Sequence, residues 1–213
     1  MVSQIKALLA RRQPGARRAP GPEGLPGQAL RGDHDLNPDF YRPGHRLSGA
    51  AVLVPLIKRR GGLTVLLTRR TDHLHDHAGQ VAFPGGRIDP IDGGGGDTAL
   101  RETEEEVGLA RRHIEVVGRL DTYITRTGFD VTPVVGVVQP PFELELDAFE
   151  VAEAFEVPLS LFLDLKNREI QTWEFEGITR YFYVYPYRDY FIWGATAGML
   201  NNLAEILTSA TKG

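Results

Sequence analysis

The sequence contains no cysteine, and its 213 residues include only two methionines and two tryptophans. The absence of cysteine excludes a disulfide-linked scaffold, a cysteine-ligated zinc site, an iron–sulfur cluster and thiol catalysis. Long hydrophobic runs are absent too, because the stretch 50–57 is far shorter than the roughly 20 residues that a transmembrane helix needs. With 42% hydrophobic and 24% charged residues, the composition is that of an ordinary globular chain. We therefore expect a cytoplasmic protein without a membrane-spanning segment.

Positive charge is scarce outside the N-terminal part of the chain. The 24 basic and 28 acidic residues give a formal charge of −4, although residues 1–46 carry eight basic against four acidic side chains. The remaining residues are therefore clearly acidic, which disfavours a generic attraction to nucleic acid or to an anionic membrane surface.

Proline and glycine crowd the stretch 14–27, and both residue types interrupt helices and central strands. We predict that residues 1–45 form a flexible Pro/Gly/Arg-rich extension in which only residues 5–12 can make a short helix. Its deletion would then leave stability and activity nearly unchanged. An organelle transit peptide also starts Arg-rich, but the proline content and the scarcity of serine disfavour one here. Residues 46–213 are predicted to form the folded domain.

Strand and helix patterns interleave along the folded domain. We expect hairpins where the apolar runs 50–57 and 63–68 flank Gly61-Gly62, and where the alternating runs 170–175 and 179–187 flank Glu176-Gly177. A helix is expected over 98–107, with Asp97 as its N-cap and Gly108 at its end. Further strands are expected at 81–83, 116–120 and 131–138, and further helices at 158–164 and 195–207. The interleaving predicts an α+β domain with a mixed sheet.

Two glycines follow directly after one short predicted strand, in Phe83-Pro84-Gly85-Gly86. Paired glycines allow a close approach of a ligand to the backbone that side chains would block. An ordinary loop would have the same composition.

Three glutamates share one face of the helix that follows. Glu102, Glu105 and Glu106 stand at i, i+3 and i+4, so their like charges repel. A hard divalent cation such as Mg²⁺, Mn²⁺ or Ca²⁺ would offset this repulsion, since such ions bind clustered oxygen ligands. A solvated acidic face is the alternative. Arg101 lies four residues before Glu105 and could orient its carboxylate.

Together, the glycine pair and the glutamate helix resemble the Nudix box: Gly, five residues, Glu, seven residues, Arg-Glu, an apolar residue, any residue, Glu-Glu, any residue, Gly and an apolar residue. Here Gly86 precedes Asp92 by the same five residues, Thr103 fills the apolar position, and Glu105 to Leu109 match directly. Asp92 replaces the first Glu, and the following loop is one residue longer and contains four successive glycines, so no role is assigned to Asp92. The resemblance implies a Nudix fold, in which a mixed β-sheet is sandwiched between α-helices.

The segment 66–86 resembles more narrowly the coenzyme A pyrophosphatases of the Nudix family. It has Leu66-Leu67-Thr68-Arg69-Arg70-Thr71, then His75, Gly79 and Phe83-Pro84-Gly85-Gly86 at the spacing of that subfamily. Thr71 replaces Ser or Ala. His75 replaces Arg, which exchanges a permanent forked cation for a ring that is mostly neutral at pH 7. Downstream segments at 131–136, 155–159 and 192–197 are also similar, so the likeness spans residues 47–207.

This resemblance implies hydrolysis of the pyrophosphate bond of coenzyme A or acyl-CoA to 3′,5′-ADP and 4′-phosphopantetheine or its acyl form. Mg²⁺ or Mn²⁺ would be the cofactor and a small-molecule nucleotide the partner. The implied metal ligands are Glu102, Glu105 and Glu106, and the implied catalytic residues are Glu105 and Arg101. The candidate substrate-binding residues are Arg69, Arg70, His75, Gly85 and Gly86, and the candidates for an extra base or ligand are Glu150, Glu153 and Glu156.

Several alternatives stay open. His75 leaves room for a pyrophosphatase of another nucleoside diphosphate linked to a moiety X, such as ADP-ribose or NADH. A non-catalytic Nudix domain that binds a nucleotide is a further alternative, although it would not need the glutamates. The alternation of His73, His75 and His77 is compatible with zinc, but solvent or substrate phosphate is favoured. The aromatic residues between Tyr181 and Trp193 could stack an adenine, although sheet packing is commoner. The sequence leaves a homodimer open.

Overall fold

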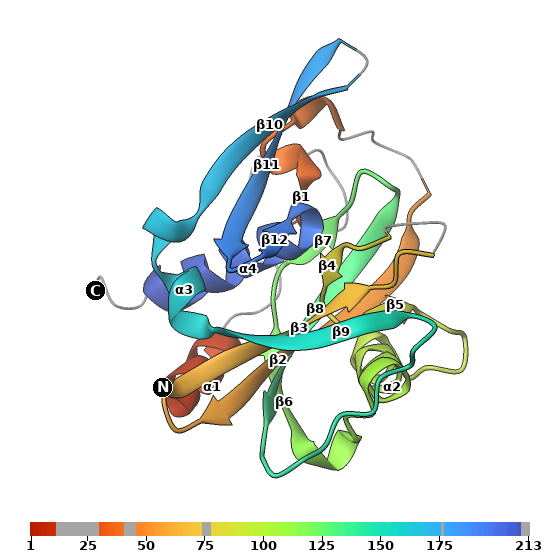
Figure 1. The fold of residues 1–213 in the computed structure, drawn as a ribbon, viewed down its shortest axis with the longest axis vertical. Helices are drawn as coiled ribbons and strands as arrows, with labels where there is room; N and C mark the ends of the chain where they lie inside the picture. Colours follow the sequence, from red (N-terminus) through yellow and green to blue (C-terminus); the bar gives the residue numbers. More distant parts are fainter. Residues whose placement is uncertain (12–29, 41–45, 74–77, 176, 210–213) are drawn as a thin grey trace.

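The computed structural model describes residues 1–11, 30–40, 46–73, 78–175 and 177–209 (Figure 1). The helices in these ranges are α1 (Val2–Arg11), α2 (Gly95–Val107), α3 (Leu159–Leu163) and α4 (Gly194–Ser209). The strands are β1 (Leu30–Gly32), β2 (Ser48–Arg59), β3 (Gly62–Arg70), β4 (Val81–Ala82), β5 (Gly85–Arg87), β6 (Ile114–Arg119), β7 (Thr122–Ile124), β8 (Phe129–Val138), β9 (Val151–Pro158), β10 (Glu169–Phe175), β11 (Ile178–Tyr187) and β12 (Tyr190–Trp193). No helix of the described ranges is long and apolar enough to cross a membrane.

The main sheet has nine strands and is mixed. Its path runs β1-β7-β8-β2-β3-β4, while β5 pairs with β2, β6 with β8 and β9 with β3. Strand β2 lies at its centre, parallel to β8 and antiparallel to β3. A second sheet of three antiparallel strands follows the order β10-β11-β12.

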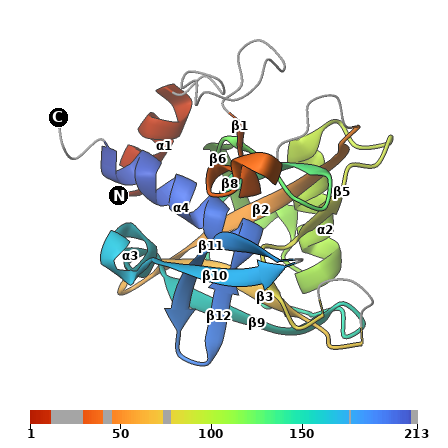
Figure 2. The same ribbon diagram turned by 90° about the horizontal axis from the view of Figure 1, so that it is seen from above.

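Alternating side chains of β2 build the two cores that flank the main sheet. Ala51 and Leu53 pack with Ala99 of α2 on one face. Val54 and Leu56 belong to the larger cluster on the other face, which also contains side chains of α1, α3 and α4. Figure 2 shows α2 on one side of the sheet and α1 and α4 on the other. Because side chains alternate along a strand, this central strand has helices over both faces. The predicted α+β class, with a mixed sheet between helices, is confirmed.

Both predicted hairpins form, and the structure has a further strand, β9, that the sequence did not predict. Strands β2 and β3 close at the pair Arg59 and Gly62, and β10 and β11 close at the pair Phe175 and Ile178. Strand β9 lies antiparallel to β3, in a segment for which the sequence predicted carboxylates and a family likeness but no strand. Three acidic residues in or next to this segment obscured its strand pattern, because β-propensity depends on the neighbours that a strand finds.

The glutamate helix α2 begins earlier than predicted and ends where predicted. Gly94, with a φ of 129°, is its N-cap, and no side chain caps the helix. The expectation that Asp97 caps it is wrong, because the glycine run itself enters the helix and places Asp97 in the first turn. Gly108 has a φ of 68° and its N–H donates to the carbonyl of Glu104 at 3.0 Å, which ends the helix in the left-handed conformation that favours glycine.

Two parts of the N-terminal extension pack onto the domain. Ile5 and Leu9 of α1 are 2% and 3% exposed, and Lys6 forms a 2.6 Å ion pair with Glu115. Strand β1 pairs in parallel with β7, and the 3₁₀ turns Asp33–Asp35 and Pro38–Phe40 follow it. These contacts contradict, for residues 2–11 and 30–40, the expectation that the extension buries little surface. The boundary at residue 45 stays a prediction, since 12–29 and 41–45 lie outside the described residues.

Candidate active site

The glycine turn and the glutamate helix meet at the centre of the main sheet. Strand β5 pairs with β2 through Gly85 and Gly86, and α2 packs over the same part of β2. A side chain at Gly86 would overlap the carboxylate of Glu102, so only glycine lets this carboxylate approach the backbone. The structure therefore brings together the two features that the sequence had indicated.

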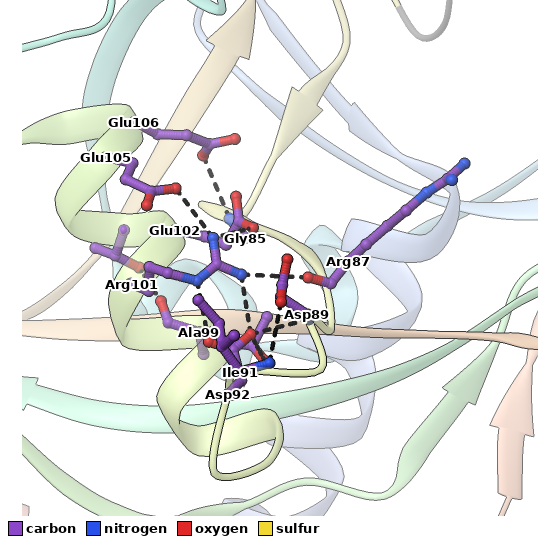
Figure 3. Close-up of polar contacts among 12 residues, drawn as sticks. Gly85, Arg87, Asp89, Ile91, Asp92, Ala99, Arg101, Glu102, Glu105 and Glu106 are labelled. Carbon is purple, nitrogen blue, oxygen red and sulfur yellow. Dashed lines mark hydrogen bonds and ion pairs between the residues drawn. The ribbon is translucent and has the colours of Figure 1, made fainter.

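Arg101 joins two of the predicted metal-binding carboxylates. Its Nη1 donates to Glu102 Oε1 at 2.7 Å and to Glu105 Oε2 at 3.0 Å (Figure 3). The side chain of Glu105 is 59% exposed, whereas that of Glu102 is 20% exposed. Burial raises the pKa of Glu102, and the hydrogen bond from Arg101 opposes this. The two glutamates thus share one cation while only Glu105 is open to solvent.

Asp92 holds the other side of the same guanidinium. Arg101 donates from Nε to Asp92 Oδ1 at 3.0 Å and from Nη2 to Oδ2 at 2.9 Å (Figure 3). Thr98 adds a hydrogen bond to Oδ2 at 2.8 Å. The hydrogen bonds from Arg101 and Thr98 hold the pKa of Asp92 well below its usual range. The sequence assigned no role to this residue, yet its shorter side chain still makes a two-pronged contact with Arg101.

Glu106 is the buried member of the glutamate set. Its side chain is 7% exposed, the backbone N–H of Gly85 donates to Oε2 at 3.3 Å, and Arg70 Nη1 lies 3.9 Å from Oε1. Burial raises the pKa of Glu106 to about 8; the Gly85 N–H and Arg70 oppose this rise, and the charges of Glu150 and Glu102 add to it. Its charged form therefore has too little compensation from the protein alone.

The three candidates for an extra base or ligand do not converge. Glu150 lies 3.8 Å from Arg70 Nη2, and its charge acts on Glu106. Glu153 instead contacts Arg69 and Tyr190, and Glu156 accepts hydrogen bonds from Arg59 and Thr64. They are dispersed because 153 and 156 lie along strand β9 rather than in a loop. Of the three, the geometry favours Glu150.

The predicted substrate-binding cations are also separated. Arg70 points toward Glu106 and Glu150, and its Nε is buried without a hydrogen-bond partner. Successive side chains of a strand point to opposite faces, so the neighbouring Arg69 points away from Arg70. Its Nε lies 3.5 Å from Oε2 of Glu153. His75 and His77 lie outside the described residues, and the ring of His73 packs at 4.9 Å from that of Phe149.

The residues around Glu106 fit a divalent cation in charge and in donor chemistry. Within the described ranges, no three His, Asp or Glu side chains are close enough to hold a metal ion in the conformation shown, in which Arg101 binds Glu102 and Glu105. However, Glu106 is buried beside two further carboxylates, and burial raises its pKa even though Arg70 lies 3.9 Å away. Carboxylate oxygens are the ligands that Mg²⁺ and Mn²⁺ take.

A cavity of about 450 Å³ opens beside the glycine turn. Gly85, Gly86 and Arg70 line one part of it, and residues of the N-terminal extension and of the second sheet line another. Its size is typical of small-molecule sites, which measure roughly 300–1,000 Å³. Tyr181, Phe182 and Trp193 of the predicted aromatic cluster line it, whereas Tyr185 is fully buried in the core.

No feature of the sequence indicated that the N-terminal extension contributes to this cavity. Asp33, Asn37 and Phe40 line it, and all three precede the predicted domain. Asn37 is 5% exposed and pairs with Tyr181 as a strand would, donating to its carbonyl at 2.8 Å and accepting from its N–H at 2.9 Å. A buried asparagine leaves a weak signal in a sequence, because most asparagines are exposed.

Comparison with known proteins agrees with this geometry. The NUDIX domain family model matches residues 47–189. Two relatives named "Uncharacterized Nudix hydrolase NudL", from Yersinia pestis (strain Pestoides F) and Yersinia pseudotuberculosis serotype O:1b (strain IP 31758), are each 45% identical over 156 residues, which cover 73% of this chain and 78% of the relative. The crystal structure of a MutT protein from Methanosarcina mazei Go1 has a similar fold, with a TM-score of 0.50 and 18% identity over 80% of this chain and 100% of that chain. The chain therefore belongs to the Nudix hydrolase family.

Proposed function

We propose that the protein hydrolyses the pyrophosphate bond of coenzyme A or acyl-CoA to 3′,5′-ADP and 4′-phosphopantetheine or its acyl form. The observation that carries the proposal is the position of the residues in the coenzyme A pyrophosphatase-like segment. Arg70, Phe83, Gly85 and Gly86 all line the cavity, and Arg70 and Gly85 also contact Glu106 of the glutamate helix. The coarser proposal, that the site acts on a nucleoside diphosphate linked to a moiety X, is supported by membership of the Nudix hydrolase family.

In this proposal Glu102, Glu105 and Glu106 hold Mg²⁺ or Mn²⁺, and Glu150 is the favoured additional ligand or base. A bound divalent cation supplies positive charge against the anionic pyrophosphate and makes a water molecule more acidic. This assignment agrees with the raised pKa of Glu106, whose buried charge needs a cation nearby.

The remaining roles follow from exposure and hydrogen bonding. Glu105 is the solvent-exposed carboxylate beside Arg101, so we assign it the role of general base, which accepts the proton of the attacking water. Arg101 orients Glu105 and Glu102 through one nitrogen, while Asp92 fixes its other two. Arg70 and the backbone of Gly85 and Gly86 contact the substrate phosphates. Arg69 turns to Glu153, so it supports the wall of the site, and contact of His75 with a phosphate stays a prediction.

A substrate panel tests the proposed activity. The purified protein is incubated with Mg²⁺ or Mn²⁺ and CoA, acetyl-CoA, ADP-ribose or NADH, and the products are identified by mass. We expect 3′,5′-ADP and the phosphopantetheine product, and at least a 10–100-fold lower turnover in Glu106→Gln, because even changes around metal ligands have effects of about that size. Glu104→Gln, an exposed residue of the same helix, is the matched control.

Two other results would favour the alternatives. Cleavage of ADP-ribose or NADH without cleavage of CoA would assign the other substrate class. Nucleotide binding without any hydrolysis would indicate a regulator. Cytoplasmic location and a homodimer stay predictions of the sequence.

A further inference from the structure

We propose that the part of the cavity formed by residues 33–40 and β11 binds a phosphomonoester on the ribose of the substrate. It would thereby select a 3′-phosphorylated nucleotide over its unphosphorylated counterpart. This inference rests on the proposed function, since it specifies which part of that substrate occupies the cavity away from the glutamates.

Two arginines from distant parts of the chain face one aromatic ring of the extension. The guanidinium carbon of Arg180 lies 4.1 Å from the centre of the Phe40 ring, and that of Arg126 lies 6.0 Å from it. All three residues line the cavity. The ring faces attract cations and hold both guanidinium groups at the same wall.

The charge of the cavity favours an anion. Four arginines line it, namely Arg70, Arg87, Arg126 and Arg180, and Asp33 is the one acidic residue among the described residues of the lining. The carboxylate of Asp33 is already occupied, because Oδ1 accepts from the hydroxyl of Tyr123 at 2.9 Å and Oδ2 accepts from the backbone N–H of Arg126 at 2.7 Å. The described lining thus contains four basic side chains and one acidic one, and Asp39, outside the lining, pairs with Arg180.

Arg180 has a donor that the protein does not use. Its side chain is 16% exposed, Nη1 donates to Asp39, and Nε is buried without a hydrogen-bond partner. A buried N–H without an acceptor is unfavourable, and guanidinium groups bind phosphate through forked hydrogen bonds. Asp39 engages only Nη1, so the outer edge of the guanidinium is left to donate to a phosphate oxygen in the cavity.

This wall is distinct from the place proposed for the pyrophosphate. Arg70 pairs with Glu106 and Glu150, whereas Arg126 and Arg180 contact residues of the extension. The side chain of Arg87 points away from the carboxylates of α2 (Figure 3), and its guanidinium lies 5.3 Å from the ring of Phe129. A substrate with two separate anionic groups matches this division of cations, since CoA carries a ribose 3′-phosphate besides its pyrophosphate.

Product binding tests the inference independently of turnover. Calorimetry on the full-length, metal-free protein compares adenosine 3′,5′-bisphosphate with adenosine 5′-monophosphate. We expect the bisphosphate to bind at least tenfold more tightly, because hydrogen bonds between charged groups have effects of about that size. The preference should fall below threefold in Arg180→Gln and in Arg126→Gln, and it should persist in Arg188→Gln, an exposed arginine of the same region that does not line the cavity. Equal affinities in the wild type, or an unchanged preference in both cavity variants, would overturn it.

Kinetics separate failure of this inference from failure of the proposed function. The ratio of kcat/KM for CoA over dephospho-CoA, and for NADPH over NADH, is measured in the same proteins. Cleavage of CoA and dephospho-CoA with equal kcat/KM would overturn the phosphomonoester site and leave the CoA activity in place. Cleavage of the dinucleotides alone would overturn the CoA activity. A preference for NADPH that Arg180→Gln abolishes would then still support the site.

Discussion

At the scale of single residues, one guanidinium contacts three acidic side chains of the candidate active site. Arg101 uses Nε and Nη2 for Asp92 and leaves Nη1 for Glu102 and Glu105. Charge-assisted bonds of this forked kind are stronger and more directional than neutral ones. We therefore expect Asp92 to be a positioning residue, which acts on the glutamates through Arg101.

We expect Asp92→Asn to lower kcat for CoA by about 10–100-fold with little change in KM. An amide offers one acceptor instead of two and turns an NH₂ group toward Arg101, so the guanidinium loses its fixed orientation. Asp92→Glu, which keeps the charge, should retain more of the activity. Steady-state kinetics and melting temperatures check this. Wild-type kcat in a folded Asn variant would show that Arg101 does not need this partner.

The buried carboxylate of Glu106 should make the metal-free protein sensitive to pH. Burial raises its pKa from 4.5 to about 8, so between these values the folded protein holds a proton that the unfolded chain has released. This extra proton stabilises the folded state relative to the unfolded chain. The stabilisation is complete below the pKa of Glu106 in the unfolded chain and is lost as the pH rises through its pKa in the folded protein. Glu106→Gln does not ionise. Its free energy of unfolding should therefore exceed that of the wild type increasingly toward pH 8, by up to about 4 kcal/mol.

Urea denaturation in EDTA between pH 5 and pH 8 measures this difference, with Glu104→Gln as the exposed control on the same helix. A difference that does not change with pH would show that Glu106 ionises as freely in the folded protein as in the unfolded chain.

The sequence predicted which site residues lie close together only where those residues belong to one short segment. The spacing in α2 and the Gly85-Gly86 pair predicted which side chains lie together, because one helix and one turn fix their geometry. Asp92 could not be assigned, since its contact with Arg101 depends on how the loop between them folds back. Glu150 could not be separated from Glu153 and Glu156, because that choice depends on the path of β9.

At the scale of elements, α1 shows how a helix of the N-terminal extension becomes part of the core. Its two buried residues, Ile5 and Leu9, lie one turn apart on the same face. Gly118 of β6 lies against Leu9, where a side chain would overlap the leucine. The sequence predicted a short helix here but not its packing, since the acceptor surface lies more than 100 residues away.

Ile5→Ala should lower the free energy of unfolding by about 2–5 kcal/mol, the range expected for a buried isoleucine. Gln4→Ala, at an exposed position of the same helix, should change it little. Urea denaturation of both variants compares them directly. Equal stabilities would mean that α1 adds nothing to the core.

At the scale of the whole molecule, the cavity is assembled from distant parts of the chain. Asn37 connects two of them, because it bonds both backbone groups of Tyr181 and the carbonyl of Asp33. Deleting residues 1–40 would remove both α1 and the part of the cavity formed by residues 33–40. The structure therefore predicts that the deletion lowers stability and activity, in contrast to the expectation from the sequence.

Asn37→Ala should destabilise the protein by about 1–3 kcal/mol, because it leaves buried backbone groups of Tyr181 unpaired. It should also weaken binding of adenosine 3′,5′-bisphosphate, since the segment that carries Phe40 loses its side-chain bonds to Tyr181 of β11. Asn167→Ala removes a similar side-chain bond at an exposed site and is the control. Thermal melting and calorimetry measure the two effects. Unchanged nucleotide binding in the destabilised variant would separate the extension from the cavity.

The order of synthesis gives the parallel pairing of β1 with β7 a further consequence. Residues 30–32 leave the ribosome about 90 residues before their partner strand, and the second sheet that completes the cavity is made later still. Nascent or truncated chains therefore lack the complete pocket. A nucleotide that binds only the complete fold stabilises complete molecules and leaves incomplete ones open to proteases. Abundance of the protein in the cell would then rise with the concentration of its own substrate.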